Sequence, residues 1–293
     1  KKGLFISPGL GKSMGENEMK NAVLVSYSVS KWSNIRTDKK VSREVAEKYG
    51  IDTSDGSYKK RLIDSPLYKA ITDAGQLGRD DYYSYTSPWS KGIAVCSVNA
   101  LDVLTDKIES AKTAFNDAVD AFVAEWPELV EARRVKFGDL FKAGDYPTGS
   151  EVRAKFGIDF NVMPLDRDGH FDDIAEIVGT EVAQELAAKL SEQQTKQWAG
   201  AAKSAWTKLY SALKHAHDSL SKGQRLHGSS LDNLQELSDL LPVLNIANDP
   251  ELDNRRRELN SLLRMYSIQS VQDKATRSKC AAEVHDIMAK INL

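Results

Sequence analysis

The sequence contains few cysteines and no long apolar run. Cys96 and Cys280 are its only two cysteines. They do not form a CxxC pair, and two isolated thiols are typical of a reducing compartment. No apolar run approaches the roughly 20 residues that a membrane-spanning helix needs, and the N-terminus has no secretory signal pattern. These absences predict a cytoplasmic protein that does not cross a membrane.

Complete catalytic and metal-binding motifs are lacking too. The stretch FISPGLGKSMG (residues 5–15) ends like a phosphate-binding loop, but Ile6 stands where the first glycine of such a loop must be. DRDGHFDD (166–173) lacks two of the ligands that a calcium-binding loop needs. His215 and His217 lie about 200° apart around a predicted helix, so they cannot share a metal ion. The sequence therefore predicts no enzymatic activity, no cofactor and no metal.

Neither sign of charge dominates the chain. The net charge is −2, but residues 1–98 hold 16 Lys and Arg against 11 Asp and Glu, whereas residues 99–293 hold 24 against 31. This balance argues against a protein built mainly to neutralise a nucleic-acid backbone. Two basic runs could contact phosphates or an acidic partner, or could simply be solvated: Lys39 with Lys40, and Arg255 with Arg256 and Arg257.

Alternating apolar and polar residues predict short strands at Ala22–Trp32 and Ile158–Pro164, and a third is expected at Ile93–Val98, between Gly92 and Asn99. After the first strand, DKKVSREVAEKYG predicts a short helix that Ser42 caps and Gly50 ends. A further helix is expected from about residue 58 to 77, with an interruption near Pro66.

The stretch GRDDYYSYTSPWSKG is rich in aromatic residues and turn formers, and it predicts an irregular loop. Aromatic side chains in a loop are over-represented at binding surfaces. Four of them are candidate contacts, although packing on the sheet is an equally good interpretation: Tyr82, Tyr83, Tyr85 and Trp89.

Two long amphipathic helices give the strongest pattern. Apolar residues recur at heptad spacing from Leu101 to Leu129, with Pro127 expected to kink the helix. A second apolar face extends over 171–220. Between them, Thr148 and Glu151 have the spacing of a capping box. We expect the long helices to pair as an antiparallel, coiled-coil-like hairpin that serves as an arm or an oligomerisation surface.

A polar linker at 221–230 separates the second long helix from three more amphipathic stretches, one of which opens with Asp249 and Pro250. The predicted fold is mainly α, of the α+β class, with a long hairpin on a small antiparallel sheet and a helical bundle at the C-terminus. The expected domains are a leader at 1–20, disordered or foreign to the natural protein, a sheet-and-hairpin domain at 21–222 and the bundle at 229–293.

Three stretches resemble a known family: AVLVSYSVSKWSNIRTDKKVSREVAEKYG, FGDLFKAGDYPTGSEVRAKFGIDFNVMPL and NLQELSDLLPVLNIANDPELDNRRRELNSLL. The chain from about Met19 onward resembles an uncharacterised bacteriophage and integrative-element family, catalogued as domain of unknown function number thirty-one fifty. Its members are often encoded beside a MoxR-type AAA+ ATPase and a von Willebrand factor A protein, sometimes near phage-type recombination genes. The resemblance implies a partner protein and no catalytic residues.

These observations lead to one main hypothesis and two alternatives. The main one is a non-enzymatic interaction protein of a phage or mobile element, acting as adaptor for an AAA+ ATPase or associating with itself through the hairpin. The first alternative is a nucleic-acid-binding protein of phage recombination, and the second is a structural assembly protein of the phage particle. In each case the expected location is the cytoplasm of the bacterial host.

Overall fold

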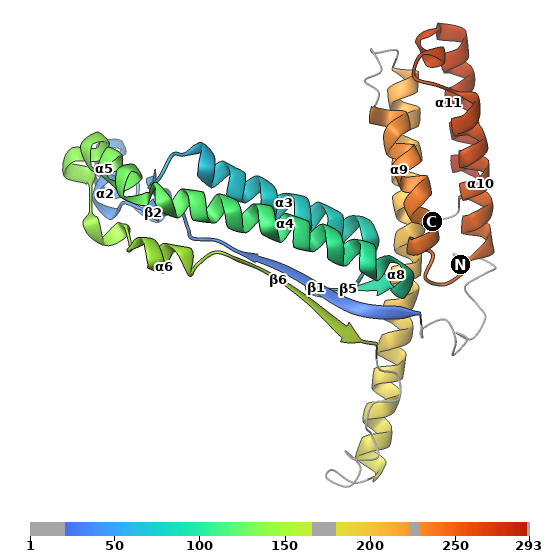
Figure 1. Ribbon diagram of the computed structural model, residues 1–293, viewed down its shortest axis with the longest axis horizontal. Helices are drawn as coiled ribbons and strands as arrows, with labels where there is room; N and C mark the ends of the chain where they lie inside the picture. Colours follow the sequence, from blue (N-terminus) through green and yellow to red (C-terminus); the bar gives the residue numbers. More distant parts are fainter. Residues whose placement is uncertain (1–20, 166–179, 223–228, 292–293) are drawn as a thin grey trace. The chain divides into compact units, whose positions relative to one another are not determined.

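Figure 1 shows the computed structural model of the chain, which describes residues 21–165, 180–222 and 229–291. Helices dominate these residues and a small antiparallel sheet accompanies them, which confirms the predicted class. The expected leader, with the loop-like stretch at 5–15, and the turn at 166–173 lie outside the described residues.

The chain divides into two compact units, which are described separately. The first contains the described residues up to Ser26, residues 82–104 and the described residues from Asn161 onward. The second contains residues 27–81 and 105–160.

The main sheet has four strands in the order β4-β5-β1-β6. They are β1 (Ala22–Ser30), β4 (Thr86–Ser90), β5 (Ile93–Ser97) and β6 (Gly157–Pro164). Strand β5 runs antiparallel to β1, with Val25 opposite Ala94, and antiparallel to β4 on its other side. The strands predicted near 22–32, 93–98 and 158–164 are therefore confirmed as β1, β5 and β6.

The prediction of an irregular loop at residues 78–92, around the aromatic residues, is wrong. Helix α3 (Pro66–Tyr85) continues through the tyrosines, and β4 follows it directly. Strand β4 turns into β5 at Gly92, whose φ of 78° lies in the left-handed region that glycine adopts without strain. Pro88 argued against a strand here, because proline lacks the N–H that a central strand needs. Strand β4 can contain it because β4 lies at the edge of the sheet.

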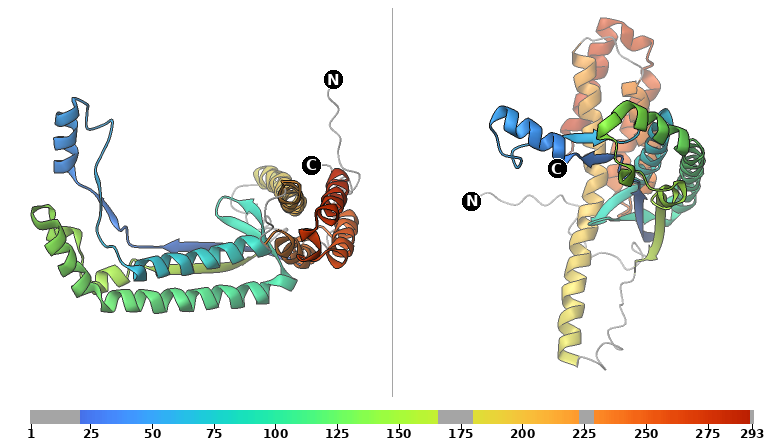
Figure 2. Two further views of the ribbon diagram at one scale, coloured as in Figure 1. Left: turned by 90° about the horizontal axis from the view of Figure 1, so that it is seen from above. Right: turned by 90° about the vertical axis from the view of Figure 1, so that its left-hand side faces the viewer.

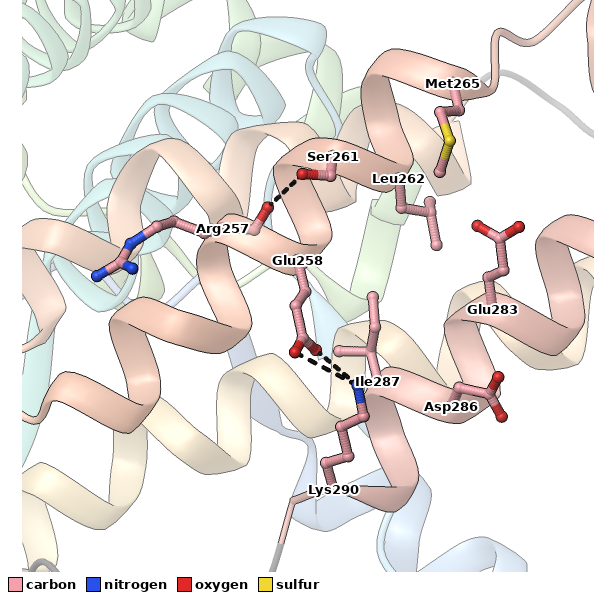
Figure 3. A pocket seen from close by; sticks show the side chains of 9 residues that line it. All are labelled: Arg257, Glu258, Ser261, Leu262, Met265, Glu283, Asp286, Ile287 and Lys290. Carbon is pink, nitrogen blue, oxygen red and sulfur yellow. Dashed lines mark hydrogen bonds and ion pairs between the residues drawn. The ribbon is translucent and has the colours of Figure 1, made fainter.

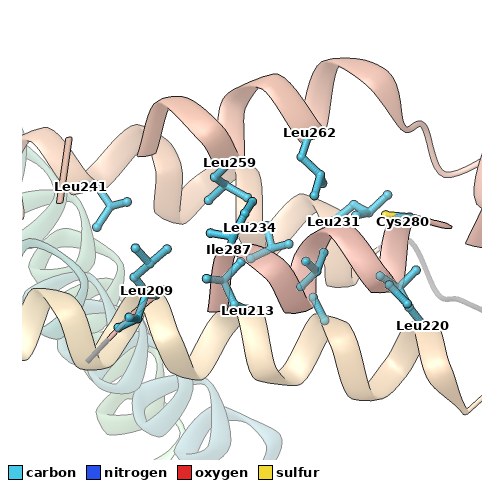
Figure 4. Packing of buried hydrophobic residues seen from close by; sticks show 14 of the residues in the cluster. Leu209, Leu213, Leu220, Leu231, Leu234, Leu241, Leu259, Leu262, Cys280 and Ile287 are labelled. Atoms are coloured by element: carbon cyan, nitrogen blue, oxygen red, sulfur yellow. The ribbon is translucent and has the colours of Figure 1, made fainter. Parts of the chain in front are cut away.

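In the first unit, four helices share one apolar core: α8 (Thr180–Ser221), α9 (Ser229–Leu244), α10 (Pro250–Met265) and α11 (Lys274–Ala289). Figure 4 shows leucines of α8, α9 and α10 pointing together, with Cys280 and Ile287 from α11 among them. Asp249 caps α10 by accepting from the Glu251 amide at 2.9 Å, as its sequence predicts. The second half of α8 belongs to this core, which therefore extends across the predicted linker.

The second unit contains a two-stranded sheet of β2 (Ile35–Thr37) and β3 (Lys59–Arg61), with α2 (Lys39–Tyr49) between them in sequence. It also contains most of α3 and of α4 (Val98–Ala124), and the segments that follow α4. These are α5 (Trp126–Phe137), the 3₁₀ turns η1 (Gly138–Leu140) and η2 (Ala143–Asp145), and α6 (Gly149–Arg153). The capping box of Thr148 and Glu151 is present at the start of α6.

Three local predictions in this unit need correction. Asp38, not Ser42, caps α2, because the Asp38 carboxylate accepts from the Lys40 and Val41 amides. The helix expected from 58 begins only at Pro66, after β3. Pro127 does not kink one long helix; α4 ends at Ala124 and the proline lies in the first turn of α5, where its missing N–H costs no hydrogen bond.

The core of the second unit is aromatic. Trp32 packs edge-on against Trp126 with ring centroids 5.1 Å apart, and Phe122 meets the same ring at 5.5 Å. Phe115 and Phe156 belong to the same buried cluster, with their ring centroids 6.3 Å apart. Edge-to-face pairs of this kind add specific geometry to a large buried apolar area.

The expected pairing of the two long helices does not account for their apolar faces. The face of α4 at Phe115, Val119 and Phe122 is buried in the aromatic core of the second unit. The face of α8 at Leu209 and Leu213 is buried by α9, α10 and α11 in the first unit. Heptad spacing indicates that one face of each helix is buried, but it does not identify the elements that bury it.

Small residues let α3 approach α4 closely in the second unit, where the two helices run side by side (Figure 1, Figure 2). A Cβ atom on Gly78 would lie 2.5 Å from the Tyr27 hydroxyl oxygen and 3.1 Å from the Ala111 Cβ. Both distances are shorter than a normal contact, so Gly78 cannot take a side chain without local movement.

Candidate interaction surfaces

The two short strands of the second unit form a ribbon with one covered and one open face. Backbone hydrogen bonds from Asp38 to Tyr58 (2.9 Å) and from Leu62 to Asn34 (3.0 Å) extend the pairing of β2 with β3 by one residue at each end. We call residues 34–38 and 58–62 the basic ribbon. Strand geometry places alternate residues on opposite faces, and on one face the residues Asn34, Asp38, Lys60 and Leu62 are buried.

A buried lysine fixes this covered face. The Lys60 side chain is only 2% exposed, and its Nζ donates to the Leu140 carbonyl oxygen and to the Asp145 carboxylate, both at 2.9 Å. The same Nζ lies 3.8 Å from the Asp38 carboxylate and 5.6 Å from the centre of the Phe137 ring. A buried ammonium needs partners of this kind. Lys60 therefore holds the ribbon against the end of α5, η1 and η2.

Asp38 connects the ribbon to α2. One carboxylate oxygen caps the helix, and the other lies 3.7 Å from the Lys142 ammonium and 3.8 Å from that of Lys60. Burial alone would raise the pKa of Asp38, but the Val41 amide, the Lys142 charge, the Lys40 amide and Lys60 together lower it. Because the pKa is lowered on folding, the charged carboxylate stabilises the fold at neutral pH, and this stabilisation is lost as the pH falls through the folded-state pKa.

The opposite face of the ribbon is open. It carries Ile35, Thr37, Lys59 and Arg61, all of them exposed, with Ile35 opposite Arg61 and Thr37 opposite Lys59. Arg61 lies 3.5 Å from the Asp64 carboxylate, in a pair whose two side chains are both more than 60% exposed. Exposed pairs of this kind are weak. The outer face therefore presents two cations and an apolar side chain to solvent.

The ribbon belongs to a basic part of the chain. Residues 31–61 hold nine Lys and Arg against five Asp and Glu, whereas the whole chain has a net charge of −2. The predicted contact residues Lys39 and Lys40 lie here, exposed in the first turn of α2, with Lys40 at 4.0 Å from Glu44. Of the two predicted basic runs, this one therefore joins a larger basic surface.

Helix α2 also exposes an apolar stripe. Val45 and Tyr49 lie one turn apart, and Ile51 follows the helix end at Gly50. Tyr49 is 69% exposed, with the Lys48 ammonium 5.7 Å from its ring centre. We call Val45, Tyr49 and Ile51 the α2 stripe. Clustered exposed apolar side chains are typical of interaction surfaces.

The aromatic residues predicted as contacts do not form one surface. Tyr82 is buried, its hydroxyl donates to the Val25 carbonyl oxygen at 3.0 Å, and burial and then Tyr83 raise its pKa to about 12. Trp89 packs edge-on against Trp198 of α8 at 6.4 Å. Tyr85 is half-buried, and only Tyr83 is well exposed. Packing on the sheet is the better interpretation for Tyr82 and Trp89.

The three arginines of α10 also separate. Arg255 is paired with Glu251 and Glu258, and Arg256 lies 3.8 Å from Asp253. Arg257 is exposed at the rim of a groove of about 420 Å³ between α10 and α11 (Figure 3). The groove floor is Leu262 and Ile287 of the apolar core, and across it Lys290 pairs with Glu258 at 3.3 Å. Its charges are of both signs, so it selects no ligand class.

Lys208 of α8 makes a separate buried contact in the first unit. Its Nζ donates to the carbonyl oxygens of Tyr83 (2.6 Å) and Thr86 (2.9 Å), where α3 ends and β4 begins. The Tyr83 carbonyl lies in the last turn of α3, where such groups have no partner within the helix. Burial lowers the pKa of Lys208 to about 8.

Lys208 predicts a pH dependence of stability. Between about pH 8 and 10.5 the unfolded chain binds the lysine proton more tightly than the folded chain, so the folded state gains stability as the pH rises through this window. The Lys208→Met variant lacks this gain. In urea denaturation at pH 7.5, 9 and 10, the free energy of unfolding of the wild type should rise with pH relative to that of the variant. A loss instead would mean that the two hydrogen bonds of the ammonium outweigh its burial.

Neither thiol nor metal chemistry is indicated in the described ranges. Cys96 and Cys280 are buried and unpaired, and burial raises the pKa of each to about 11, which makes both thiols inert. No group of three or more His, Cys, Asp or Glu side chains in the described part of the chain could hold a metal ion. None of its helices combines the length and apolarity that crossing a membrane requires.

Comparison with protein families, with curated proteins and with solved structures found no match to this chain. The candidate surfaces therefore stand on their geometry. The sequence identified Lys39 and Lys40 but missed the ribbon beside them, because three-residue strands such as IRT and KKR show no clear alternation. The local excess of Lys and Arg was the one signal that could have found it.

Proposed function

We propose that this chain works by binding a partner rather than by catalysis, as an interaction protein of a phage or mobile-element module. The observation that carries the proposal is the exposed α2 stripe on a helix whose cap, Asp38, is anchored to the buried Lys60. A rigid apolar surface binds at a low cost in conformational entropy. Phe115, Val119 and Phe122 of α4 and Leu209 and Leu213 of α8 are buried within their own units, and we therefore assign the partner surface to the exposed α2 stripe.

The resemblance to the phage family suggests the partner. It favours an adaptor role for the MoxR-type AAA+ ATPase or the von Willebrand factor A protein encoded beside such genes. If so, the ATPase supplies the nucleotide-binding site, and this chain needs none.

A pull-down with the neighbouring ATPase tests this role. The tagged chain should retain the ATPase in at least one of three conditions: ATP, ADP or no nucleotide. The double variant Val45→Asp/Tyr49→Asp should lose it, because a charge at each position opposes apolar docking. Val135→Asp is the matched control, since Val135 is an exposed apolar residue of the same unit outside the stripe. No retention of the wild type in any condition would refute the adaptor role.

A second candidate function is nucleic-acid binding in phage recombination. The charge excess of residues 31–61 favours it, because Lys and Arg concentrated on one part of a protein attract the phosphate backbone. The two functions use different surfaces, so the loss of one leaves the other testable.

A further inference from the structure

We propose that the outer edge of strand β6 binds a second copy of the chain, whose own β6 pairs with it in the antiparallel direction. The inference goes beyond the proposed function, because it uses residues of β6 and neither the α2 stripe nor the basic ribbon. It names the binding edge, the occupant and the register in which the two strands meet.

The main sheet has two edges, and they differ in how they are protected. Strand β4 carries Pro88 and a register irregularity between Pro88 and Ser90, and the Lys208 ammonium of α8 donates to its Thr86 carbonyl oxygen at 2.9 Å. Strand β6, eight residues long, has no Lys or Arg, and its one proline is its last residue. In the described part of the chain no strand lies beyond β6 in this sheet. Prolines, bulges and lysines keep natural edge strands from pairing with other chains, so β6 is open to a further strand.

Hydrogen bonds to β1 show which side chains of β6 share a face. The Ser28 hydroxyl donates to the Asp159 carboxylate at 3.4 Å, and the Asn161 amide donates to the Ser26 hydroxyl oxygen at 3.3 Å. The two bonds follow β1 and β6 in opposite directions, as in an antiparallel ladder. Asp159 and Asn161 therefore lie on one polar face of the sheet, where both are exposed.

The residues of β6 that alternate with this polar pair are apolar. Ile158, Phe160 and Val162 lie on the opposite face, because successive side chains of a strand point to opposite sides. Ile158 is buried in the aromatic core of the second unit, whereas Val162 is 47% exposed. A strand paired with β6 covers this exposed valine.

Two β6 strands are complementary when they run antiparallel with Phe160 opposite Phe160. Residues directly opposite each other lie on the same face of a sheet. This register places Ile158 opposite Val162 of the second copy. It also places Asp159 opposite Asn161 of the second copy. Because an amide nitrogen carries two hydrogens, Asn161 can donate to that carboxylate in addition to its bond within its own copy.

The charge on the strand selects this register and favours a second copy as the occupant. Asp159 is the one charged residue of β6. An antiparallel pair centred on Asp159, or a parallel pair in register, places two carboxylates side by side, and like charges directly opposite destabilise a sheet. Centring the pair on Phe160 gives the apolar and the polar side chains partners of their own kind. The same strand in a second copy therefore completes the edge.

Sedimentation velocity of the full chain tests the association at concentrations between about 5 and 500 μM. One strand edge is smaller than a standard interface, so we expect a wild-type dimer with a dissociation constant on the order of 10–100 μM. Val162→Lys should weaken it at least about 10-fold, because a lysine on an edge strand opposes pairing. Val135→Lys is the matched control, since it adds the same charge to an exposed valine of α5 and should leave the dimer unchanged.

Cysteine cross-linking tests the register. Because Asp159 lies opposite Asn161, a mixture of the single variants Asp159→Cys and Asn161→Cys should form a disulfide-linked dimer. Either variant alone should form much less, since residues two positions out of register lie about 7–8 Å apart, beyond the reach of a disulfide. The natural thiols of Cys96 and Cys280 are buried and do not compete. Circular dichroism should show that every variant is folded, because the substituted side chains are exposed.

Three results would overturn the proposal. The first is a wild-type chain that stays monomeric over the whole concentration range, which would leave the edge to an extended segment of another protein. The second is a Val162→Lys variant that dimerises as tightly as the wild type. The third is cross-linking of the mixture that is no stronger than that of either variant alone.

Discussion

Replacing Lys60 with methionine is expected to destabilise the second unit by about 3–5 kcal/mol, because it leaves the buried Asp38 carboxylate without its nearest buried cation. It also removes the hydrogen bonds to the Leu140 carbonyl and the Asp145 carboxylate. Methionine has a similar length, so the change tests the charge rather than the volume. Urea denaturation followed by circular dichroism measures the effect.

The neighbouring lysine is the control for Lys60. Lys59 lies on the same strand but on the exposed outer face, and Lys59→Met should change stability by less than about 0.5 kcal/mol. Equal stability of the two variants would show that the buried network does not hold the ribbon. The rigid platform on which both proposed functions depend would then be absent.

Leu213→Ala is expected to destabilise the first unit by about 2–5 kcal/mol, because Leu213 is fully buried in the core that α8 shares with α9, α10 and α11. The loss combines the transfer of apolar atoms with the cavity that they leave. Thermal and urea denaturation monitored by tryptophan fluorescence are suitable readouts, since Trp206 packs against the same core.

The matched control lies on the same helix and in the same predicted stripe. Leu186 is 43% exposed, so Leu186→Ala should cost less than about 0.5 kcal/mol. The sequence alone predicts that both leucines lie on the buried face of the helix. A large cost at Leu186 would show that the first part of α8 is also covered, as the hairpin prediction requires.

Local features of the fold could be predicted well from the sequence. The caps at Asp249 and Thr148 depend on side chains within three residues of the backbone groups that they satisfy, so their spacing is sufficient. The predicted strands β1 and β6 were found from their alternating apolar residues, and β5 from a short apolar run that follows Gly92. Gly50 ends α2 with a φ of 64°, as a glycine after a helix commonly does.

Features that depend on distant residues could not be predicted. Lys60 is one of three consecutive basic residues in the sequence, and nothing in that run predicts its hydrogen bonds to Leu140 and Asp145, which are 80 or more positions away. The sequence around Tyr82 predicted an exposed loop, but Tyr82 lies on helix α3 and its hydroxyl donates to the Val25 carbonyl oxygen of β1. The partners of α4 and α8 also depend on tertiary packing, which the heptad spacing does not encode. The candidate site was therefore half predicted: its exposed lysines were found, and the buried residue that positions their neighbours was missed.

The close approach at Gly78 has a consequence for the divergence of this fold. Any side chain there meets the Tyr27 hydroxyl oxygen, whereas a Cβ on Gly56 or Gly144 would meet nothing within 4 Å. In a saturation mutagenesis library, Gly78 should accept fewer substitutions than Gly56 and Gly144. Distant relatives that keep this unit are then recognisable by a small residue at this position together with the tyrosine that faces it, even where the surface residues have changed completely.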